Sequence, residues 1–240
     1  MPKAKYEGIY HSIKKRIEAQ DYPYQSLLPS ENTLIEEYAC SRNTVRRALA
    51  ELVADGYVQT MQGRGVRVIY HPVGKTMFTI GVIESFQETA RRNRLHAVTK
   101  VTKFETVIAD ECFAAKSGFS VGDELWSIER VRYLDGKALI RDVNYFLKEF
   151  VPGLTPEIAA NSIFDYIENT LGMQIITSKR LITVEHVTAR DEKLLDMGTY
   201  GCVVDVVNQT FNDAGLLFEY TQSRHHPDYF SFQDIATRKK

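Results

Sequence analysis

Residues 28–69 constrain the fold more than any other part of this 240-residue chain, because helix starts and stops occur there in close succession. Ser30 and Ser41 each precede a run with helical periodicity, and a serine hydroxyl at that place can cap the free N–H groups of a helix. Gly56 follows the second run at the left-handed position that glycine favours. We therefore expect two capped helices, the second ending near Asp55.

A helix also precedes this segment, and a hairpin ends it. Residues 6–20 have apolar side chains at helical spacing, and Pro23 stops the pattern. Two short runs, 57–62 and 66–69, favour β-structure, and the turn Gly63-Arg64-Gly65 between them predicts a hairpin. Three helices followed by a hairpin is the plan of a winged helix-turn-helix.

The helix after Ser41 has a packed side and a basic side. Its apolar residues at helical spacing are Val45, Ala48, Leu49 and Leu52. The polar residues off that stripe are Arg42, Asn43, Arg46 and Arg47. Like charges one turn apart, at the positive end of a helix, oppose helix formation, and such a conflict is common at functional sites. A DNA groove would remove it, since arginine bonds guanine and asparagine bonds adenine in the major groove.

Other residues of this segment suit a DNA interface as well. The hydroxyls of Ser41 and Thr44 can reach phosphates, and Arg64 lies at the tip of the hairpin, where two glycines allow the backbone to approach DNA. Residues 1–75 contain 11 Lys and Arg but 8 Asp and Glu, so a slightly basic head precedes an acidic remainder. The alternative is a solvated basic helix face. The combination of capped helices, basic face and wing favours DNA binding.

The stretch LPSENTLIEEYACSRNTVRRALAELVADGYVQTMQGRGVRV, from Leu28 to Val68, resembles the DNA-binding domain of the GntR family of bacterial regulators. The elements LPSE, SRNTVRRAL and QGRG carry the likeness. The resemblance implies contacts with double-stranded operator DNA through Asn32, Arg42, Asn43, Thr44, Arg46, Gly63 and Arg64. Asn32 stands where an arginine is common in the family.

The remainder of the chain predicts a second domain. Residues 71–77 contain Pro72 and Gly74 and have little periodicity, so we expect a linker there, between a DNA-binding domain at 1–70 and a domain at 78–240. Alternating β-rich and helical runs predict an α+β fold around a mostly antiparallel sheet. The expected strands cover 98–109, 123–134, 138–147, 174–186, 201–211 and 215–225, with helices near 84–94, 155–171 and 188–197.

Two arginines share one face of a predicted strand in this domain. Ile128, Arg130, Arg132 and Leu134 alternate with Glu129, Val131 and Tyr133. One interpretation is an edge strand with inward charges. The other is an anion site, because guanidinium groups suit phosphate oxygens. The spacing alone leaves both open.

Residues 78–235 resemble the UTRA effector-binding domain of the HutC subgroup, whose fold is related to chorismate lyase. The resemblance implies that Arg130 and Arg132 bind the acidic group of a small effector. It also assigns effector contacts to Ser85, Phe86, Gln87, Asp142, Ser162, Phe164, Glu219 and Arg224. Phe164 replaces the tyrosine of a Ser-x-Tyr element, and Arg224 stands where many relatives carry tyrosine.

Within that subgroup, the segments VPGLTPEIAANSIFDYIENTLG and LFEYTQSRHHPDYFSFQDIATRKK resemble trehalose operon repressors. This likeness implies a repressor of a sugar-utilisation operon that is released by trehalose 6-phosphate. Another sugar phosphate or small acid is the alternative effector. A lyase-like enzyme is a remote alternative, since the sequence shows no GxSxG, HExxH or Cys/His motif of a convincing kind. An architectural DNA binder would leave the implied effector residues unexplained.

The remaining features indicate a cytoplasmic protein without cofactor or metal. Cys40, Cys112 and Cys202 are widely spaced and form no CxxC pair, so we expect reduced, mostly buried thiols. The N-terminus lacks the apolar core of a signal peptide, and no apolar run approaches the length of a membrane span. Bacterial helix-turn-helix proteins usually bind palindromes as pairs, so we expect a homodimer held largely by the second domain.

Overall fold

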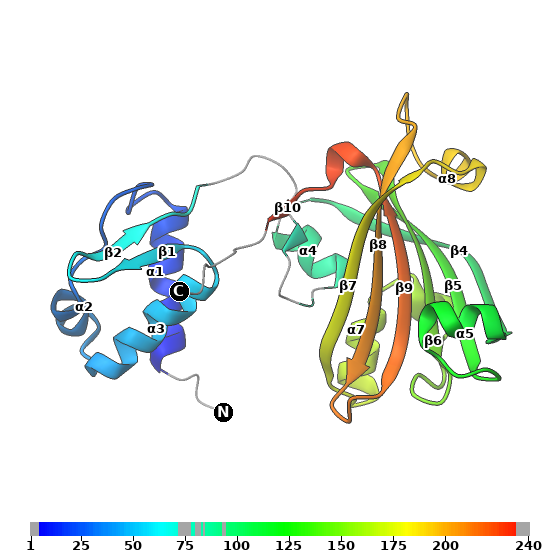
Figure 1. Ribbon diagram of the computed structural model, residues 1–240, viewed down its shortest axis with the longest axis horizontal. Coiled ribbons are helices and arrows are strands. Elements are labelled where there is room, and N and C mark those ends of the chain that lie inside the picture. The colour runs from blue at the N-terminus through cyan, green and yellow to red at the C-terminus, as the bar shows by residue number, and fades with distance from the viewer. Residues whose placement is uncertain (1–4, 72–77, 80–82, 84, 93–94, 234–240) are drawn as a thin grey trace. The chain divides into compact units, whose positions relative to one another are not determined.

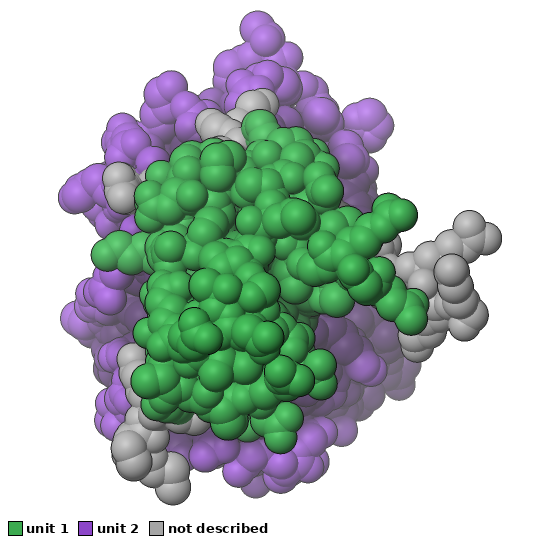
Figure 2. Space-filling view, turned by 90° about the vertical axis from the view of Figure 1, so that its left-hand side faces the viewer, with its two compact units in different colours: residues 1–74, 234–240 green, residues 75–233 purple. Residues whose placement is uncertain are grey.

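The computed structural model describes residues 5–71, 78–79, 83, 85–92 and 95–233. They form two compact units, one within residues 5–71 and one within residues 78–233 (Figure 2). No helix in these ranges combines the length and apolarity needed to cross a membrane.

The first unit is a winged helix-turn-helix, as predicted. Its helices are α1 (Lys5–Glu18), α2 (Glu31–Tyr38) and α3 (Arg42–Ala54), and its antiparallel hairpin joins β1 (Val58–Met61) to β2 (Gly65–Val68) (Figure 1). Ser30 and Ser41 cap α2 and α3, each accepting a hydrogen bond of 3.2 Å from the backbone N–H three residues later. Both predicted caps are confirmed.

The three helices pack around one apolar core. Ile13, Leu34 and Leu52, from α1, α2 and α3, are fully buried. Val58 and Val68 are paired across the hairpin and join the same core. The apolar stripe of α3 is therefore turned inward, and its basic residues remain on the surface.

The second unit is built on a six-stranded antiparallel sheet in the order β4-β5-β6-β9-β8-β7. The strands are β4 (Ala97–Ile108), β5 (Glu124–Leu134), β6 (Lys137–Leu147), β7 (Ile175–His186), β8 (Cys202–Asn212) and β9 (Leu217–His225). A short parallel pair, β3 (Phe78–Thr79) and β10 (Phe232–Gln233), lies outside this sheet. The predicted α+β class and antiparallel sheet are confirmed. In the turn between β5 and β6, Asp135 and Gly136 both have positive φ, as the sequence indicated.

Helices cover both faces of the sheet. On one face lie α4 (Phe86–Arg92), α6 (Pro156–Ala159), α7 (Ile163–Asp165) and the π-helical turn Tyr166–Thr170. On the other face lie α5 (Glu111–Ser117) and α8 (Ala189–Leu194). We call the first the inner face and the second the outer face. The short 3-10 helix Pro227–Tyr229 follows β9, and its Tyr229 packs in the same cluster as Ala90 of α4.

Three details differ from the sequence-based expectations. The helix expected at 155–171 is broken, because Ser162 caps a new helical start by accepting a hydrogen bond from the Asp165 N–H at 3.2 Å. The sequence reasoning also missed α5, which Asp110 caps at its start. The thiols are free, but Cys112 is exposed and the other two are half-buried, so the expected burial is wrong.

Gly118 ends α5 and provides a stability test. It has φ of +86°, and a Cβ there would meet the Gln209 side-chain nitrogen at 2.9 Å, whereas Gly122 has φ of +93° with open space around it. A left-handed alanine costs about 1–2 kcal/mol, so Gly122→Ala should lower the free energy of unfolding by about that amount. Gly118→Ala should lower it further, because the Gln209 amide must also move from the Ser117 carbonyl, its partner at 2.8 Å.

The measurement is urea unfolding of both variants. Trp126, the one tryptophan of the sequence, lies on β5, so its fluorescence reports the second unit. Equal losses of stability in the two variants would contradict the steric argument.

Candidate functional site

The basic side of α3 is exposed and held in place by its neighbours. Arg42 donates a hydrogen bond of 2.9 Å to the Asn32 side chain, and Arg46 bonds both carboxylate oxygens of Glu31 at 3.2 and 3.1 Å. These contacts tie α3 to the start of α2. The negative charge of Glu31 thus reduces the repulsion between the arginines of α3. The sequence reasoning had assigned this role to DNA alone.

The other residues expected at DNA are also on the surface of the first unit. Arg47 stacks over the ring of Tyr6, with 3.8 Å between the guanidinium carbon and the ring centroid. Asn43 is exposed on α3, and Gly63 and Arg64 are exposed in the turn between β1 and β2. The unit therefore presents a helix with exposed basic groups at its start, each held by a neighbouring side chain, together with an exposed arginine at the wing.

A cavity of about 180 Å³ lies against the inner face of the six-stranded sheet. Nine of the ten effector residues expected from the sequence line it: Ser85, Phe86, Gln87, Arg130, Arg132, Asp142, Ser162, Phe164 and Glu219. They come from α4 and the residue before it, from α7 and the residue that caps it, and from strands β5, β6 and β9. The edge-strand interpretation of β5 is wrong, because this strand lies between β4 and β6.

Arg130 and Arg132 are buried in the cavity wall but have different partners. Arg132 forms an ion pair of 2.7 Å with Asp142, bonds Thr99 at 2.7 Å and lies over the ring of Phe86. Arg130, which is 4% exposed, bonds the Asn144 side-chain oxygen at 3.0 and 2.8 Å and the Ala159 carbonyl at 3.3 Å. Its partners are neutral: no carboxylate of the described residues lies within ion-pair distance of Arg130.

These surroundings shift the pKa values of the charged groups. Burial, with the nearby charge of Arg132, lowers the pKa of Arg130 to about 9. Burial alone would raise the pKa of Asp142, but the positive charges of Arg132 and Arg130 bring it below its ordinary value. Burial raises the pKa of Glu219, although a hydrogen bond of 2.7 Å from Thr221 opposes this. An anion would therefore be stabilised beside Arg130.

Arg224, the tenth expected effector residue, does not line the cavity. Side chains alternate along β9, so Glu219, Thr221, Ser223 and His225 reach the inner face, whereas Arg224 points to the outer face. Its guanidinium bonds both Asp191 oxygens, at 3.1 and 3.0 Å, and the His186 carbonyl at 2.7 Å. The expectation of an effector contact at Arg224 is at odds with this position.

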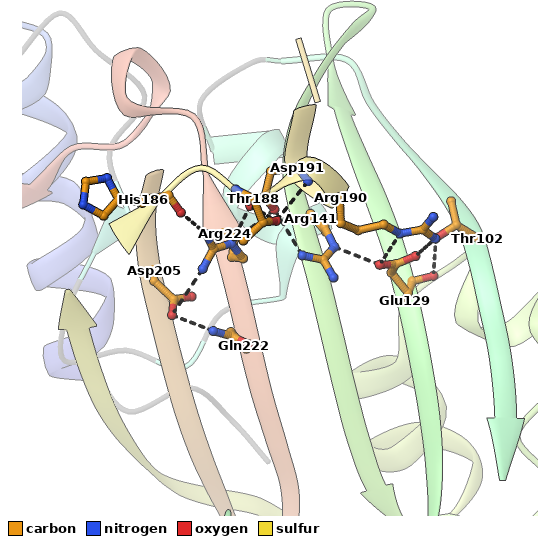
Figure 3. A network of polar contacts seen from close by, with 10 residues as sticks. All are labelled: Thr102, Glu129, Arg141, His186, Thr188, Arg190, Asp191, Asp205, Gln222 and Arg224. Atoms are coloured by element: carbon orange, nitrogen blue, oxygen red, sulfur yellow. Dashed lines mark hydrogen bonds and ion pairs between the residues drawn. The ribbon is translucent and has the colours of Figure 1, made fainter. Parts of the chain in front are cut away.

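Arg224 belongs to a buried polar network on the outer face (Figure 3). Asp191, which is 0% exposed, bonds Arg224 and Arg141 and also completes the capping box of α8 with Thr188. Glu129 continues the network through ion pairs with Arg141, at 2.8 Å, and with Arg190. Burial tends to raise the pKa of Glu129, but these hydrogen bonds lower it to about 2.

Sequence reasoning missed several residues that line the cavity: Asn144, Arg180, Asn208, Thr210, Thr221 and Ser223. The alternation of side chains along each strand would have indicated these residues. Residues 142, 144 and 146 of β6 share one face, as do residues 219, 221 and 223 of β9. The expected site therefore covered the β5 side of the cavity and included no residue of β7 or β8.

Comparison with known proteins agrees with both units. Residues 5–68 match the family of bacterial regulatory proteins named gntR, and residues 92–231 match the UTRA domain. The HTH-type transcriptional regulator TreR of Bacillus subtilis (strain 168) is 37% identical over 236 residues, which is 98% of each chain.

Solved structures resemble this chain as well. The effector-binding domain of the B. subtilis trehalose repressor TreR is 39% identical, with a TM-score of 0.54 over 60% of this chain and 99% of that domain. The possible transcriptional regulator YydK of B. subtilis subsp. subtilis str. 168 shares the fold, with 23% identity and a TM-score of 0.82 over 98% of this chain and 100% of that chain.

The curated relatives are named as transcriptional regulators, which favours a regulator over a lyase-like enzyme. The chain therefore belongs to the GntR family of bacterial regulatory proteins, and it is a transcriptional regulator with an N-terminal winged helix-turn-helix and a C-terminal UTRA domain.

Proposed function

We propose that this regulator is a cytoplasmic, homodimeric repressor of a trehalose-utilisation operon, and that trehalose 6-phosphate releases it from operator DNA. The environment of Arg130 is the observation that supports an effector with a phosphate group. A buried cation is costly unless opposite charges offset its removal from water, and Asp142 and Glu219 do so only in part, since the pKa of Arg130 stays lowered. A phosphate group in the cavity would supply that charge and accept paired N–H bonds from the guanidinium.

The rest of the cavity suits the sugar part of such an effector. Asp142, Glu219 and Asn144 offer buried hydrogen-bonding groups, and Phe86 and Phe164 offer apolar surface. Sugars present hydroxyls at their edges and C–H groups on their faces, so both kinds of surface are used. The similarity to the effector domain of TreR supports trehalose 6-phosphate among sugar phosphates.

The DNA interface that we propose consists of the start of α3, the cap before it and the wing. Arg42, Asn43, Arg46 and Arg47 are placed to meet base edges or phosphates, and Ser41, Thr44, Asn32, Gly63 and Arg64 to contact the backbone or the minor groove. All of these groups except the half-buried Thr44 are exposed in the described structure.

Release follows from linkage between the two ligands. If the effector favours a conformation whose two DNA-binding units mismatch the operator, DNA must weaken effector binding by the same factor by which effector weakens DNA binding. A coupling of about 1–3 kcal/mol gives a five- to 150-fold change in affinity.

The first test concerns Arg46. Operator DNA is first obtained by selecting random duplexes on the wild-type protein. Arg46→Ala should then weaken operator binding by about 1–3 kcal/mol and relax base preference, since that is the value of a paired arginine–guanine contact. Arg16→Ala is the matched control, because Arg16 on α1 forms a similar surface ion pair of 2.6 Å with Glu37 on α2. Equal gel-shift affinities of the two variants would exclude Arg46 as a base-contacting residue.

The second test concerns Arg130. Arg130→Ala should bind the operator as wild type does but resist release by trehalose 6-phosphate, with effector affinity reduced by about 2–5 kcal/mol. Trehalose without phosphate should release neither protein. Arg190→Ala, which removes an arginine from the outer face, should respond like wild type. Release of Arg130→Ala at the wild-type effector concentration would show that this arginine is only structural.

The third test concerns assembly. We expect the full chain to sediment as a dimer at micromolar concentration, because two DNA-binding units are needed to occupy the two halves of a palindrome. Sedimentation velocity with and without effector measures this directly. A monomer under both conditions would contradict the proposed arrangement.

A further inference from the structure

The floor of the cavity is a polar row that crosses the sheet from strand to strand. Asn144 on β6, Thr221 on β9, Asn208 on β8 and Arg180 on β7 are successive backbone partners. All four line the cavity. Asn144 donates a hydrogen bond of 2.8 Å to Thr221, and Arg180 donates one of 2.9 Å to Asn208.

Two unmatched cations lie at the ends of this row. Arg130, on β5, bonds Asn144 at the near end. Arg180, on the edge strand β7, forms the far end, and no carboxylate among the described residues pairs with it. Its Nε is bound to Asn208, and the side chain is accessible to solvent, so its guanidinium can meet a ligand.

The length of the row decides what kind of sugar can use both ends. Neighbouring strands are about 4.8 Å apart, so β6 and β7, three spacings apart, are separated by about 14 Å along the sheet. One pyranose ring covers little more than one such spacing. A sugar with one ring, bound at Arg130 and Arg132 by its phosphate, therefore ends over β6 and β9, whereas a second ring extends over β8 and β7.

We propose that Arg180, positioned by Asn208, forms a distal subsite for the second ring of a disaccharide phosphate. This inference rests on the proposed function and deepens it, since it assigns the preference for two rings to a named pair of residues. The guanidinium donates to hydroxyl oxygens of the distal ring, and the Asn208 amide fixes its direction. The phosphate subsite at Arg130 is common to sugars of either length, so selectivity arises at β7.

The experiment compares trehalose 6-phosphate with glucose 6-phosphate by calorimetric titration of the full chain. Arg180→Met keeps the aliphatic stem and removes the donors. It should weaken trehalose 6-phosphate binding about tenfold to 100-fold, the usual value of hydrogen bonds to a charged group, while changing glucose 6-phosphate binding less than about twofold. Asn208→Ala should cause a smaller loss with the same selectivity.

Lys179→Met is the matched control, because this neighbouring cation is absent from the cavity lining and lies near the ring of Phe211. It should bind both sugars as wild type does. If Arg180→Met lowers the affinity for both sugars by the same factor, or for neither, the proposed distal subsite is overturned. The proposed phosphate site at Arg130 is unaffected by that result. If wild type binds neither sugar phosphate, the proposed effector class is overturned and the subsite with it.

Discussion

Buried charges lie on both faces of the six-stranded sheet, and the alternation of side chains along its central strands decides which face each one reaches. On β6, Asp142 faces the cavity and Arg141 faces the outer network. On β9, Ser223 faces the cavity and Arg224 the outer network. The strands between these two surfaces must keep their register, because a shift by one residue would exchange every charge between the two faces.

The two faces compensate their charges differently. On the outer face, each arginine contacts a carboxylate of the protein, as Arg141 and Arg224 do with Asp191. On the inner face, Asp142 matches Arg132, but Arg130 has neutral partners among the described residues. A buried cation that lacks a carboxylate partner leaves electrostatic free energy that an anionic ligand can recover. This difference distinguishes the outer face of the sheet from the inner face, where we propose that the effector binds.

The elements of the fold were largely predictable because they carry local signals. The hydroxyls of Ser30 and Ser41 indicate helix starts, and the pair Asp135-Gly136 indicates a turn because both residues tolerate positive φ. The helix α5 was missed, although Asp110 and Gly118 bracket it in the same way. The break at Ser162 was also missed, since an apolar helical pattern continues across it.

Less of the candidate site could be predicted, because its residues meet through strand pairing. Arg130 and Arg132 were recognised from alternation within one strand, but Arg180 joins them only through the pairing of β7 with β8 and of β8 with β9. The error at Arg224 was avoidable, since residues 219 and 224 of one strand have opposite parity and point to opposite faces. No local pattern links Asp191 to Arg141 and Arg224, which lie far from it in sequence.

Asp191 restricts how this protein can change over evolutionary time. One carboxylate completes the start of α8, balances Arg141 from β6 and balances Arg224 from β9. Loss of Asp191 would leave the buried Arg224 with Asp205 as its remaining carboxylate, at 3.9 Å, whereas Arg141 would keep Glu129. Asp191 therefore cannot be replaced before Arg224 changes without loss of stability. Asp191 and Arg224 are therefore expected to vary together across related sequences, and the same constraint holds on the other face of the sheet for the buried pair of Arg132 and Asp142.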